Sequence, residues 1–254
     1  MQYLCADKAP KVDIIIMKIA LIGYGKMGHA IEKISLERGH QIVCTVDIAN
    51  ASDIESEAFR SADVAIEFTT PATAFGNCTK ALAQGVKVVS GSTGWTEHLP
   101  QIKSIVETSG GGFFYTSNYS IGVNVLFAVN KYLAKIMDGF GQYDVAMREI
   151  HHIHKLDHPS GTAITLADGI ISNMSRKSTW SEDASAPADA LKITSERTGE
   201  VPGTHIIEYT SSVDKITISH EAFSREGFAL GAVVAAEWLK DRSGFFGMND
   251  MLDL

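Results

Sequence analysis

Short apolar runs alternate with helix-like segments from Met17 to about Ser120, and this alternation restricts the folds open to the chain. Segments such as KMGHAIEKISLERG and ATAFGNCTKALAQG separate the runs, and Gly39 and Gly85 stand where such helices should end. The runs are KIALIG, QIVCTVD, DVAIEF, VKVVSG and GGFFYTS. Strands that alternate with helices favour a parallel sheet with helices on both faces. We therefore predict an α/β fold with a doubly wound parallel sheet.

A glycine loop follows the first apolar run. Gly23, Gly25 and Gly28 form G-x-G-x-x-G between a predicted strand and a predicted helix, and Asp47 ends the second run. Glycines allow a tight turn against a pyrophosphate, the helix N-terminus attracts the anion, and a carboxylate about 20 residues later binds a ribose hydroxyl. The alternative is a turn that binds nothing, with Asp47 as a plain helix cap. Because the glycine pattern, its place between a strand and a helix, and the position of Asp47 agree, we predict a Rossmann-type dinucleotide site.

Hydroxyl-rich turns follow three further strands, as EFTTPA, SGSTGW and TSNYS. The carboxyl ends of strands line the ligand crevice of a doubly wound sheet. Each turn alone could be an ordinary connection, but three in series favour a cleft, which makes Phe68 and Thr69 cofactor candidates. Asp47 would repel a 2′-phosphate, which favours NADH, whereas Lys26 could still reach that phosphate and keeps NADPH open.

The pattern changes from about Tyr143. The segments YDVAMREIHH, ADALKITSER, GTHIIEYTSS and DKITISHEAF predict strands, and the last two predict a hairpin around Ser211–Asp214 in an antiparallel or mixed sheet. GFALGAVVAAEWLKD predicts a helix, and SRKSTWSEDASAPADA predicts a mobile polar loop. We expect a dinucleotide-binding domain over 17–120, completed by 226–254. An inserted α+β domain for substrate binding and oligomerisation is expected over 121–225.

Three histidines and a lysine, His151, His152, His154 and Lys155, lie at the end of one predicted strand. Ser160-Gly161-Thr162 then begins a predicted helix, so the free amides of Gly161 and Thr162 could seat an anion. Lys155 adds positive charge, and His151 or His152 could supply a proton near neutral pH. Alternatives are a metal site built from the histidines, which the competing lysine disfavours, and a solvated strand end. Arg225 could bind a second carboxylate or form a surface ion pair.

Composition excludes several functional classes. The 254 residues carry a formal net charge of −8 with no basic stripe, which argues against nucleic-acid binding. Cys5, Cys44 and Cys78 form no disulfide framework or metal-type pair, so we expect a protein of the reducing cytoplasm. The first apolar stretch is too short to cross a membrane and lacks the order of a signal peptide, so we expect no membrane partner. Residues 1–16 lack periodicity and are expected to be an extension or a mis-set start before Met17.

The segment EIHHIHKLDHPSGTA resembles the E-x-H-H-x-x-K-x-D-x-P-S-G-T-A signature of the dihydrodipicolinate reductase (4-hydroxy-tetrahydrodipicolinate reductase) family. FTTP, GSTGW, NYSIGVNV and SREGFALGAV match in the same order, and coverage runs from about Met17 to Leu254. The resemblance implies NADH- or NADPH-dependent reduction of a small cyclic dicarboxylate in the diaminopimelate route to lysine. It also implies a homotetramer assembled through the sheets of the substrate domains.

The resemblance further implies residue roles. His151 would be the general acid/base, Lys155 the proton donor, His152 a substrate ligand, and Ser160, Gly161 and Thr162 the seat of a substrate carboxylate. The dinucleotide would be held by Gly23, Tyr24, Gly25, Lys26, Met27, Gly28, Asp47, Gly91, Ser92, Thr93, Thr116, Ser117, Asn118 and Tyr119. No metal is expected.

The glycine loop departs from the family pattern. Many members carry G-x-x-G-R-M-G, but Ile22 stands here at the first Gly and Lys26 at the Arg. The alternative functions are another two-domain dehydrogenase, of the homoserine or sugar type, and a non-catalytic dinucleotide-sensing regulator. The intact histidine–lysine segment argues against both.

Overall fold

The computed structural model describes residues 16–224 and 226–254, which fall into two compact units. The first unit contains the described residues up to Ser117 together with Ala232–Gly247, and the second contains the described residues of Asn118–Gly231 together with Met248–Leu254. The expectations for residues 1–15 and for Arg225 lie outside the described residues.

The first unit contains a six-stranded sheet in which every neighbouring pair is parallel. Its strands in spatial order are β11 (Gly244–Phe246), β5 (Gly112–Tyr115), β4 (Lys87–Ser90), β3 (Val64–Glu67), β1 (Lys18–Ile22) and β2 (Gln41–Val46). β3 is buried along its whole length and β4 at all but its first residue, as expected for strands covered on both faces. The order reverses between β1 and β3, and such a switch point is where doubly wound sheets bind ligands. The predicted Rossmann-type sheet is therefore confirmed.

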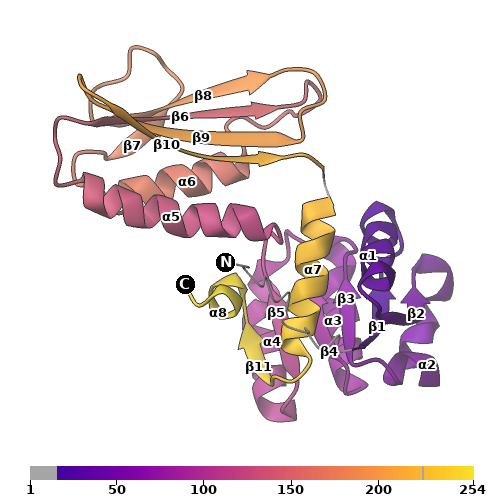
Figure 1. The fold of residues 1–254 in the computed structure, drawn as a ribbon. Coiled ribbons are helices and arrows are strands. Elements are labelled where there is room, and N and C mark those ends of the chain that lie inside the picture. Colours follow the sequence, from indigo (N-terminus) through magenta and orange to yellow (C-terminus); the bar gives the residue numbers. More distant parts are fainter. Residues whose placement is uncertain (1–15, 225) are drawn as a thin grey trace, which may run out of the picture. The chain divides into compact units, whose positions relative to one another are not determined.

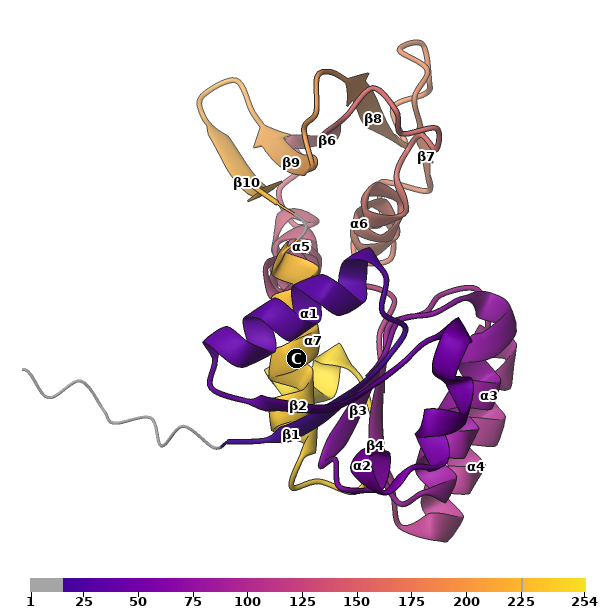
Figure 2. The ribbon, with the colours of Figure 1, turned by 90° about the vertical axis from the view of Figure 1, so that its right-hand side faces the viewer.

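Helices cover both faces of this sheet (Figure 2). α1 (Lys26–Glu37) and the C-terminal part of α7 (Glu226–Leu239) lie on one face, where Arg38 Nε donates to Glu237 Oε1 at 2.8 Å. The other face carries α3 (Pro71–Ala83) and α4 (Leu99–Ser109). Short helical segments complete the connections: η1 (Ile48–Glu55), α2 (Glu57–Arg60) and η2 (Thr96–His98). Gly39 and Gly85 have φ of +85° and +78° and directly follow the C-cap residues of α1 and α3, which confirms the predicted helix ends.

The second unit contains a five-stranded mixed sheet. Its strands in spatial order are β10 (Lys215–Ala222), β9 (Gly203–Thr210), β6 (Asp144–His151), β8 (Ala190–Arg197) and β7 (Thr179–Ser181). β9 is antiparallel to both neighbours, whereas β6, β8 and β7 run parallel. Ser211 N donates to Asp214 O at 2.9 Å in the β9–β10 connection. The predicted hairpin and mixed sheet are confirmed.

Two helices, α5 (Ile121–Met137) and α6 (Gly161–Ile171), cover one face of this sheet (Figure 1). The core between them is formed by apolar residues of the helices and alternate residues of the strands, including Leu126, Leu166, Met147, Ile193 and Ile207. α8 (Met248–Leu252) also belongs to this unit.

Alternation along two strands decides which polar groups are buried. β6 buries Val145, Met147, Glu149 and His151 on its covered face, because successive strand residues point to opposite faces. β9 buries Gly203, His205, Ile207 and Tyr209 in the same way. Glu149, His151 and His205 therefore lie buried on the covered face of the sheet, next to its apolar residues.

The predicted mobile loop between residues 175 and 190 contains β7. This strand pairs with β8, and the pairing begins with Thr179 opposite Ala190. Lys177 is 4% exposed, forms an ion pair with Asp144 at 2.9 Å and donates to Ala188 O. These contacts and the packing of Trp180 against the core fix the segment, so the loop prediction is wrong for these residues. Within the described residues, no helix is both long and apolar enough to cross a membrane.

Candidate active site

The glycine loop lies between β1 and α1 at the switch point of the first sheet. Gly23 has φ of +92°, and a Cβ there would lie 2.1 Å from Phe68 O. A Cβ on Gly28 would lie 2.4 Å from Gly23 O, whereas one on Gly25 would meet nothing within 4 Å. Gly23 and Gly28 are thus required by the tight packing of the loop. Gly25 leaves open space at the helix start, where a pyrophosphate would need the backbone to be accessible.

α1 begins without a side-chain cap. Gly25 is its N-cap residue, no side chain caps the helix, and no acidic residue lies in its first turn. The first amides of the helix and its positive dipole end are therefore available for an anion. Tyr24 turns back along the helix, donating to Glu32 and contacting the His29 ring at 4.1 Å between centroids. The arrangement fits the phosphates of a dinucleotide.

Asp47 follows β2 and is exposed. Its Oδ1 accepts a hydrogen bond from Ile48 N at 2.8 Å, and its own N donates to Asn50 Oδ1, which forms a capping box at the start of η1. The residue does cap a helix, as the alternative interpretation held. An exposed carboxylate at the carboxyl end of β2 nevertheless retains acceptor capacity for a ribose hydroxyl.

A buried carboxylate that the sequence analysis did not single out joins the turns after β3 and β4. Glu67 is 0% exposed and accepts hydrogen bonds from Ser90 Oγ at 2.6 Å, Ser92 Oγ at 2.7 Å and Thr69 N at 2.9 Å. A Cβ on Gly91 would lie 2.1 Å from the Phe68 ring. The structure thus brings the candidates Phe68, Thr69, Gly91 and Ser92 together, with Thr93 exposed beside them.

The predicted cofactor turn after β5 contains residues of both units. Thr116 and Ser117 end the first segment of the first unit, and Asn118 and Tyr119 begin the second unit. Asn118 Oδ1 accepts from Ser120 N at 2.9 Å, whereas Tyr119 is 2% exposed. The sequence signal for this turn thus falls on a unit boundary.

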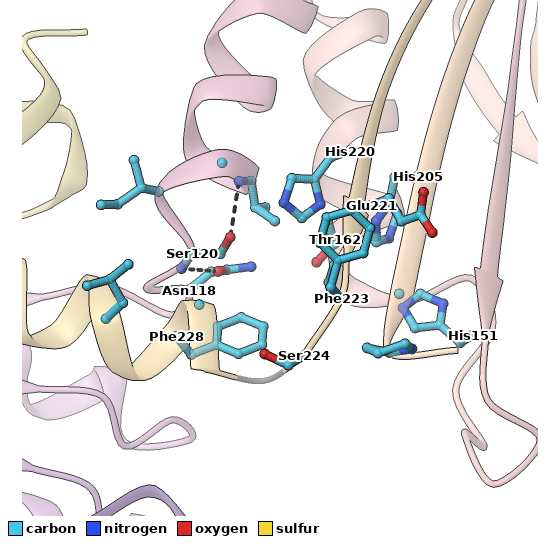
Figure 3. Close-up of a pocket in the computed structure, with 18 residues that line it drawn as sticks. Asn118, Ser120, His151, Thr162, His205, His220, Glu221, Phe223, Ser224 and Phe228 are labelled. Carbon is cyan, nitrogen blue, oxygen red and sulfur yellow. Dashed lines mark hydrogen bonds between the residues drawn. The ribbon is translucent and has the colours of Figure 1, made fainter. Parts of the chain in front are cut away.

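The second unit contains a cavity of about 380 Å³ (Figure 3). His151, Thr162 and Asn118 are the sequence-predicted residues that line it. Apolar side chains of Ile121, Val123, Phe223, Phe228 and Leu230 form much of the remaining wall. His205 and His220 also line it, and neither was singled out from the sequence. Side chains alternate between the two faces of a strand, so the segment THIIEYT places His205 on the same buried face as Ile207 and Tyr209. This alternation is the sequence signal that could have identified His205.

Behind His151 lies a second buried carboxylate. Glu149 is 0% exposed, and its Oε2 lies 3.3 Å from His151 Nδ1 and 3.7 Å from His205 Nε2. Its Oε1 accepts from Arg197 Nη2 at 2.9 Å and from Ser160 N at 3.1 Å. The carboxylate therefore contacts groups from β6, β8, β9 and the turn before α6.

Titration in this cluster is strongly perturbed. Burial alone would raise the pKa of Glu149, but the adjacent His151 ring and hydrogen bonds from Ser160 and Arg197 hold it far below its usual value. Burial lowers the pKa of His205 to about 4, with repulsion by His151 acting in the same direction. Burial also lowers the pKa of His220. At neutral pH the cluster therefore contains an ionised carboxylate beside a neutral His205.

Ser160 is the N-cap residue of α6, and its Oγ accepts from Ala163 N at 3.2 Å. The same Oγ lies 3.1 Å from His205 Nε2. Gly161 is exposed and Thr162 lines the cavity, so the first turn of α6 borders the open space. The helix start where the sequence predicts an anion seat therefore borders the cavity that His151 also lines.

Lys155 lies in the turn after β6 and is not among the residues that line the cavity. Its Nζ donates to Asp157 Oδ2 at 2.8 Å, and this bond lowers the pKa of Asp157. Asp157 thus holds the Lys155 ammonium through an ion pair. His152 is half-buried, whereas His154 and His158 are exposed and pair with Glu200 and Glu182.

A metal-binding geometry occurs once among the described residues. Ligand atoms of Glu149, His151 and His205 all lie within 4.8 Å of one another. His151, His152 and His154, the alternative metal site suggested by the sequence, do not form such a group of ligand atoms among the described residues. Arg197 and the Ser160 amide already occupy Glu149 Oε1, and the guanidinium supplies the positive charge that a buried carboxylate needs. The negative charge of Glu149 is therefore already balanced by Arg197.

Comparisons with known proteins agree over nearly the whole chain. Family models described as "Dihydrodipicolinate reductase, N-terminus" and "Dihydrodipicolinate reductase, C-terminus" match residues 17–119 and 122–252. The 4-hydroxy-tetrahydrodipicolinate reductase of Christiangramia forsetii is 48% identical, covering 93% of this chain and 98% of that protein. The one of Archaeoglobus fulgidus is 33% identical, covering 93% and 100%.

A solved structure has the same fold. The dipicolinate-bound dihydrodipicolinate reductase from Paenisporosarcina sp. TG-14 is 23% identical, with a TM-score of 0.74 over 93% of this chain and 100% of that one. The two matched models together span both units, and the signature around His151 forms part of the buried cluster. The chain therefore belongs to the dihydrodipicolinate reductase family.

Proposed function

We propose that this chain reduces 4-hydroxy-tetrahydrodipicolinate (dihydrodipicolinate) to tetrahydrodipicolinate, a step of the diaminopimelate route to lysine. As a member of the family it is an NAD(P)H-dependent oxidoreductase, acting on CH or CH2 groups. The observation that carries the proposal is the meeting of His151 with the N-terminal turn of α6 at one cavity, because the reaction needs proton transfer beside a carboxylate seat.

The reaction balances with one substrate, one reduced nicotinamide and one proton. The hydroxylated substrate loses water, and the resulting conjugated double bond gains a hydride at one carbon and a proton at its neighbour. Bound nicotinamide supplies the hydride; the chain's own side chains must supply the proton. A positioned acid contributes typically 10²–10⁴-fold to such a step.

We assign the proton chemistry to Lys155 and His151. Lys155 is the proton donor, and its ammonium is oriented by Asp157 at 2.8 Å. His151 is the general acid/base, with one ring nitrogen facing Glu149 and the ring at the cavity wall. The Lys155 side chain is 21% exposed and lies on a turn. Its ammonium therefore has room to leave Asp157 and contact the substrate.

The substrate is a dianion, which accounts for the remaining polar groups. We propose that the turn of Ser160, Gly161 and Thr162 holds one carboxylate through backbone amides at the helix start. His152 and Arg225 are the further substrate ligands that we propose. The dipicolinate bound to the relative from Paenisporosarcina is a dicarboxylate, which supports this substrate class.

For the dinucleotide we propose the loop from Gly23 to Gly28, Asp47, and the turns at Phe68–Thr69, Gly91–Thr93 and Thr116–Tyr119. The open space at Gly25 and the uncapped start of α1 support a pyrophosphate there. NADH is preferred over NADPH in this proposal, because Asp47 is exposed where a 2′-phosphate would lie. Lys26, the first residue of α1, is the group that could oppose this preference.

We also propose a cytoplasmic homotetramer without a metal, formed through the sheets of the second units. Light scattering of the purified protein tests the assembly, and fractionation of the native cells tests the location. A monomer in solution would contradict the first of these, and recovery outside the cytoplasm the second.

The testing experiment generates the substrate in place from pyruvate and aspartate semialdehyde with the preceding synthase, and follows loss of nicotinamide absorbance. We expect rapid oxidation by the wild-type protein. Lys155→Ala should retain cofactor binding and lose about 10²-fold or more in turnover. A folded wild-type protein that binds NADH without turnover would instead support a dinucleotide-sensing regulator, and turnover of homoserine-type or sugar substrates another dehydrogenase.

A further inference from the structure

We propose that Glu149 is the positioning residue of this site: its carboxylate fixes the proton of the His151 ring on Nδ1 and at the same time holds the turn at Ser160. The inference deepens the proposed function, and the kinetic part of its test rests on that function.

The first step is the placement of the carboxylate. Glu149 is fully buried two residues before His151 on β6, so both side chains point to the covered face of the sheet. Oε2 lies 3.3 Å from His151 Nδ1, within ion-pair distance though away from the line of an ideal hydrogen bond. The carboxylate is thus close enough to select the side of the ring that carries hydrogen.

The second step is the charge of Glu149. Arg197 Nη2 donates to Oε1 at 2.9 Å, and the same guanidinium also donates to Asp157 O at 2.7 Å and to Glu196 O at 2.8 Å. A guanidinium held at three points provides a fixed positive charge beside the buried carboxylate. Glu149 therefore stays ionised and can only accept hydrogen bonds.

The third step concerns the two nitrogens of His151. Because Glu149 is acceptor-only, the neutral ring places its hydrogen on Nδ1. Nε2 is then the nitrogen that exchanges protons. It lies over Gly203, where a Cβ would be 3.0 Å away, and Gly203 lines the cavity with His151.

The fourth step links the ring to the anion seat. Oε1 accepts from Ser160 N at 3.1 Å, and Ser160 begins α6, whose Thr162 lines the cavity. One rigid carboxylate thus sets the position of the proton-exchanging ring relative to the helix start. Such support is needed because misplacement by about 1 Å can cost a large factor in rate.

The direct test is the tautomer of His151, measured by nitrogen NMR of histidine-labelled protein in the presence of a chelator, so that no metal fixes the ring. We expect the wild-type ring as the Nδ1–H form at pH values where it is neutral. In Glu149→Gln, the amide oxygen should keep the Arg197 and Ser160 bonds, which turns the NH2 group toward Nδ1 and shifts the ring to the Nε2–H form. A wild-type ring already in the Nε2–H form, or no change in the variant, would overturn the proposal.

The kinetic test uses the same variant. Glu149→Gln should lower kcat about 10²-fold while KM changes less than kcat, because the ring loses its orientation more than the substrate loses its ligands. Glu196→Gln is the matched control: its carboxylate is 40% exposed and pairs with Arg148 on the sheet, so kinetics should stay at the wild-type level. Wild-type kcat in a folded Glu149→Gln protein would contradict the positioning role.

Glu149→Gln leaves the half-buried Arg197 guanidinium without its counter-charge, so the single variant could fail to fold. The double variant Glu149→Gln/Arg197→Gln removes both charges and keeps the Ser160 amide as donor to the glutamine oxygen. It should show the same Nε2–H tautomer and the same loss of kcat, whereas recovery of wild-type kcat would overturn the proposal. If the wild-type protein has no reductase activity, the proposed function fails, but the tautomer measurement still decides the link between Glu149 and His151.

Discussion

His205 lies directly opposite Glu149 across the antiparallel β6–β9 pair, with 3.7 Å between Nε2 and Oε2. The histidine is 4% exposed and lies 3.1 Å from Ser160 Oγ. A buried neutral histidine beside an ionised carboxylate makes the stability of the second unit depend on pH.

Stability should fall as the pH drops from about 6.5 to about 4. Burial lowers the pKa of His205 to about 4, so in this window the unfolded chain binds a proton that the folded chain does not. The free energy of unfolding therefore decreases as pH falls, by up to about 3 kcal/mol. The depressed pKa of Glu149 acts at lower pH, below its ordinary value.

His205→Asn should lose this slope, which urea unfolding at a series of pH values can measure. The same exchange at His154, whose side chain is 68% exposed, is the matched control and should keep the slope. A His205→Asn protein with the wild-type slope between about pH 6.5 and 4 would assign the effect to another group.

Asp47→Asn should shift cofactor preference toward NADPH. Asparagine keeps the oxygen that accepts from Ile48 N, so the start of η1 is preserved while the negative charge is removed. NADH affinity should fall and NADPH affinity should rise or stay level, as measured by the change in nicotinamide fluorescence on binding. Equal changes for both nucleotides would mean that Asp47 is not the ribose ligand.

Gly203→Ala should reduce turnover by displacing the His151 ring. The new Cβ would lie 3.0 Å from Nε2 and 3.3 Å from Cδ2, and the φ of +155° at this position is one that side chains rarely adopt. Gly139→Ala, where the nearest atom is 3.6 Å away, is the control and should behave as wild type. Full activity of Gly203→Ala would show that the ring tolerates movement.

Glu67→Gln should destabilise the first unit by about 1–3 kcal/mol. Its carboxylate accepts from Ser90, Ser92 and Thr69, and a glutamine NH2 group would face at least one of these donors. Denaturant unfolding of the variant measures the loss, with Glu107→Gln on the exposed side of α4 as the control. Cofactor affinity should also fall because two predicted cofactor turns lose their shared anchor. A stable variant with normal NADH affinity would disprove this.

Local patterns in the sequence determined much of the architecture. Alternating strands and helices indicated the parallel sheet, Gly39 and Gly85 marked helix ends, and period-2 strands indicated the mixed sheet and its hairpin. These features depend on neighbouring residues, because side-chain period and glycine geometry are local properties. The predicted mobile loop failed around β7, since the burial of Lys177 and Trp180 is a tertiary effect that polar composition conceals.

The candidate site divides in the same way. That His151, Lys155 and the Ser160 turn lie at one strand end follows from the sequence alone, because they are close along the chain. The meeting of Glu149 with Arg197 and His205 depends on the folded structure, since strand register sets which residues of β6, β8 and β9 face one another. The same holds for Glu67, whose partners on β4 and its following turn become neighbours through parallel pairing. Contacts between distant strands follow from register and burial, which no single segment of the sequence specifies.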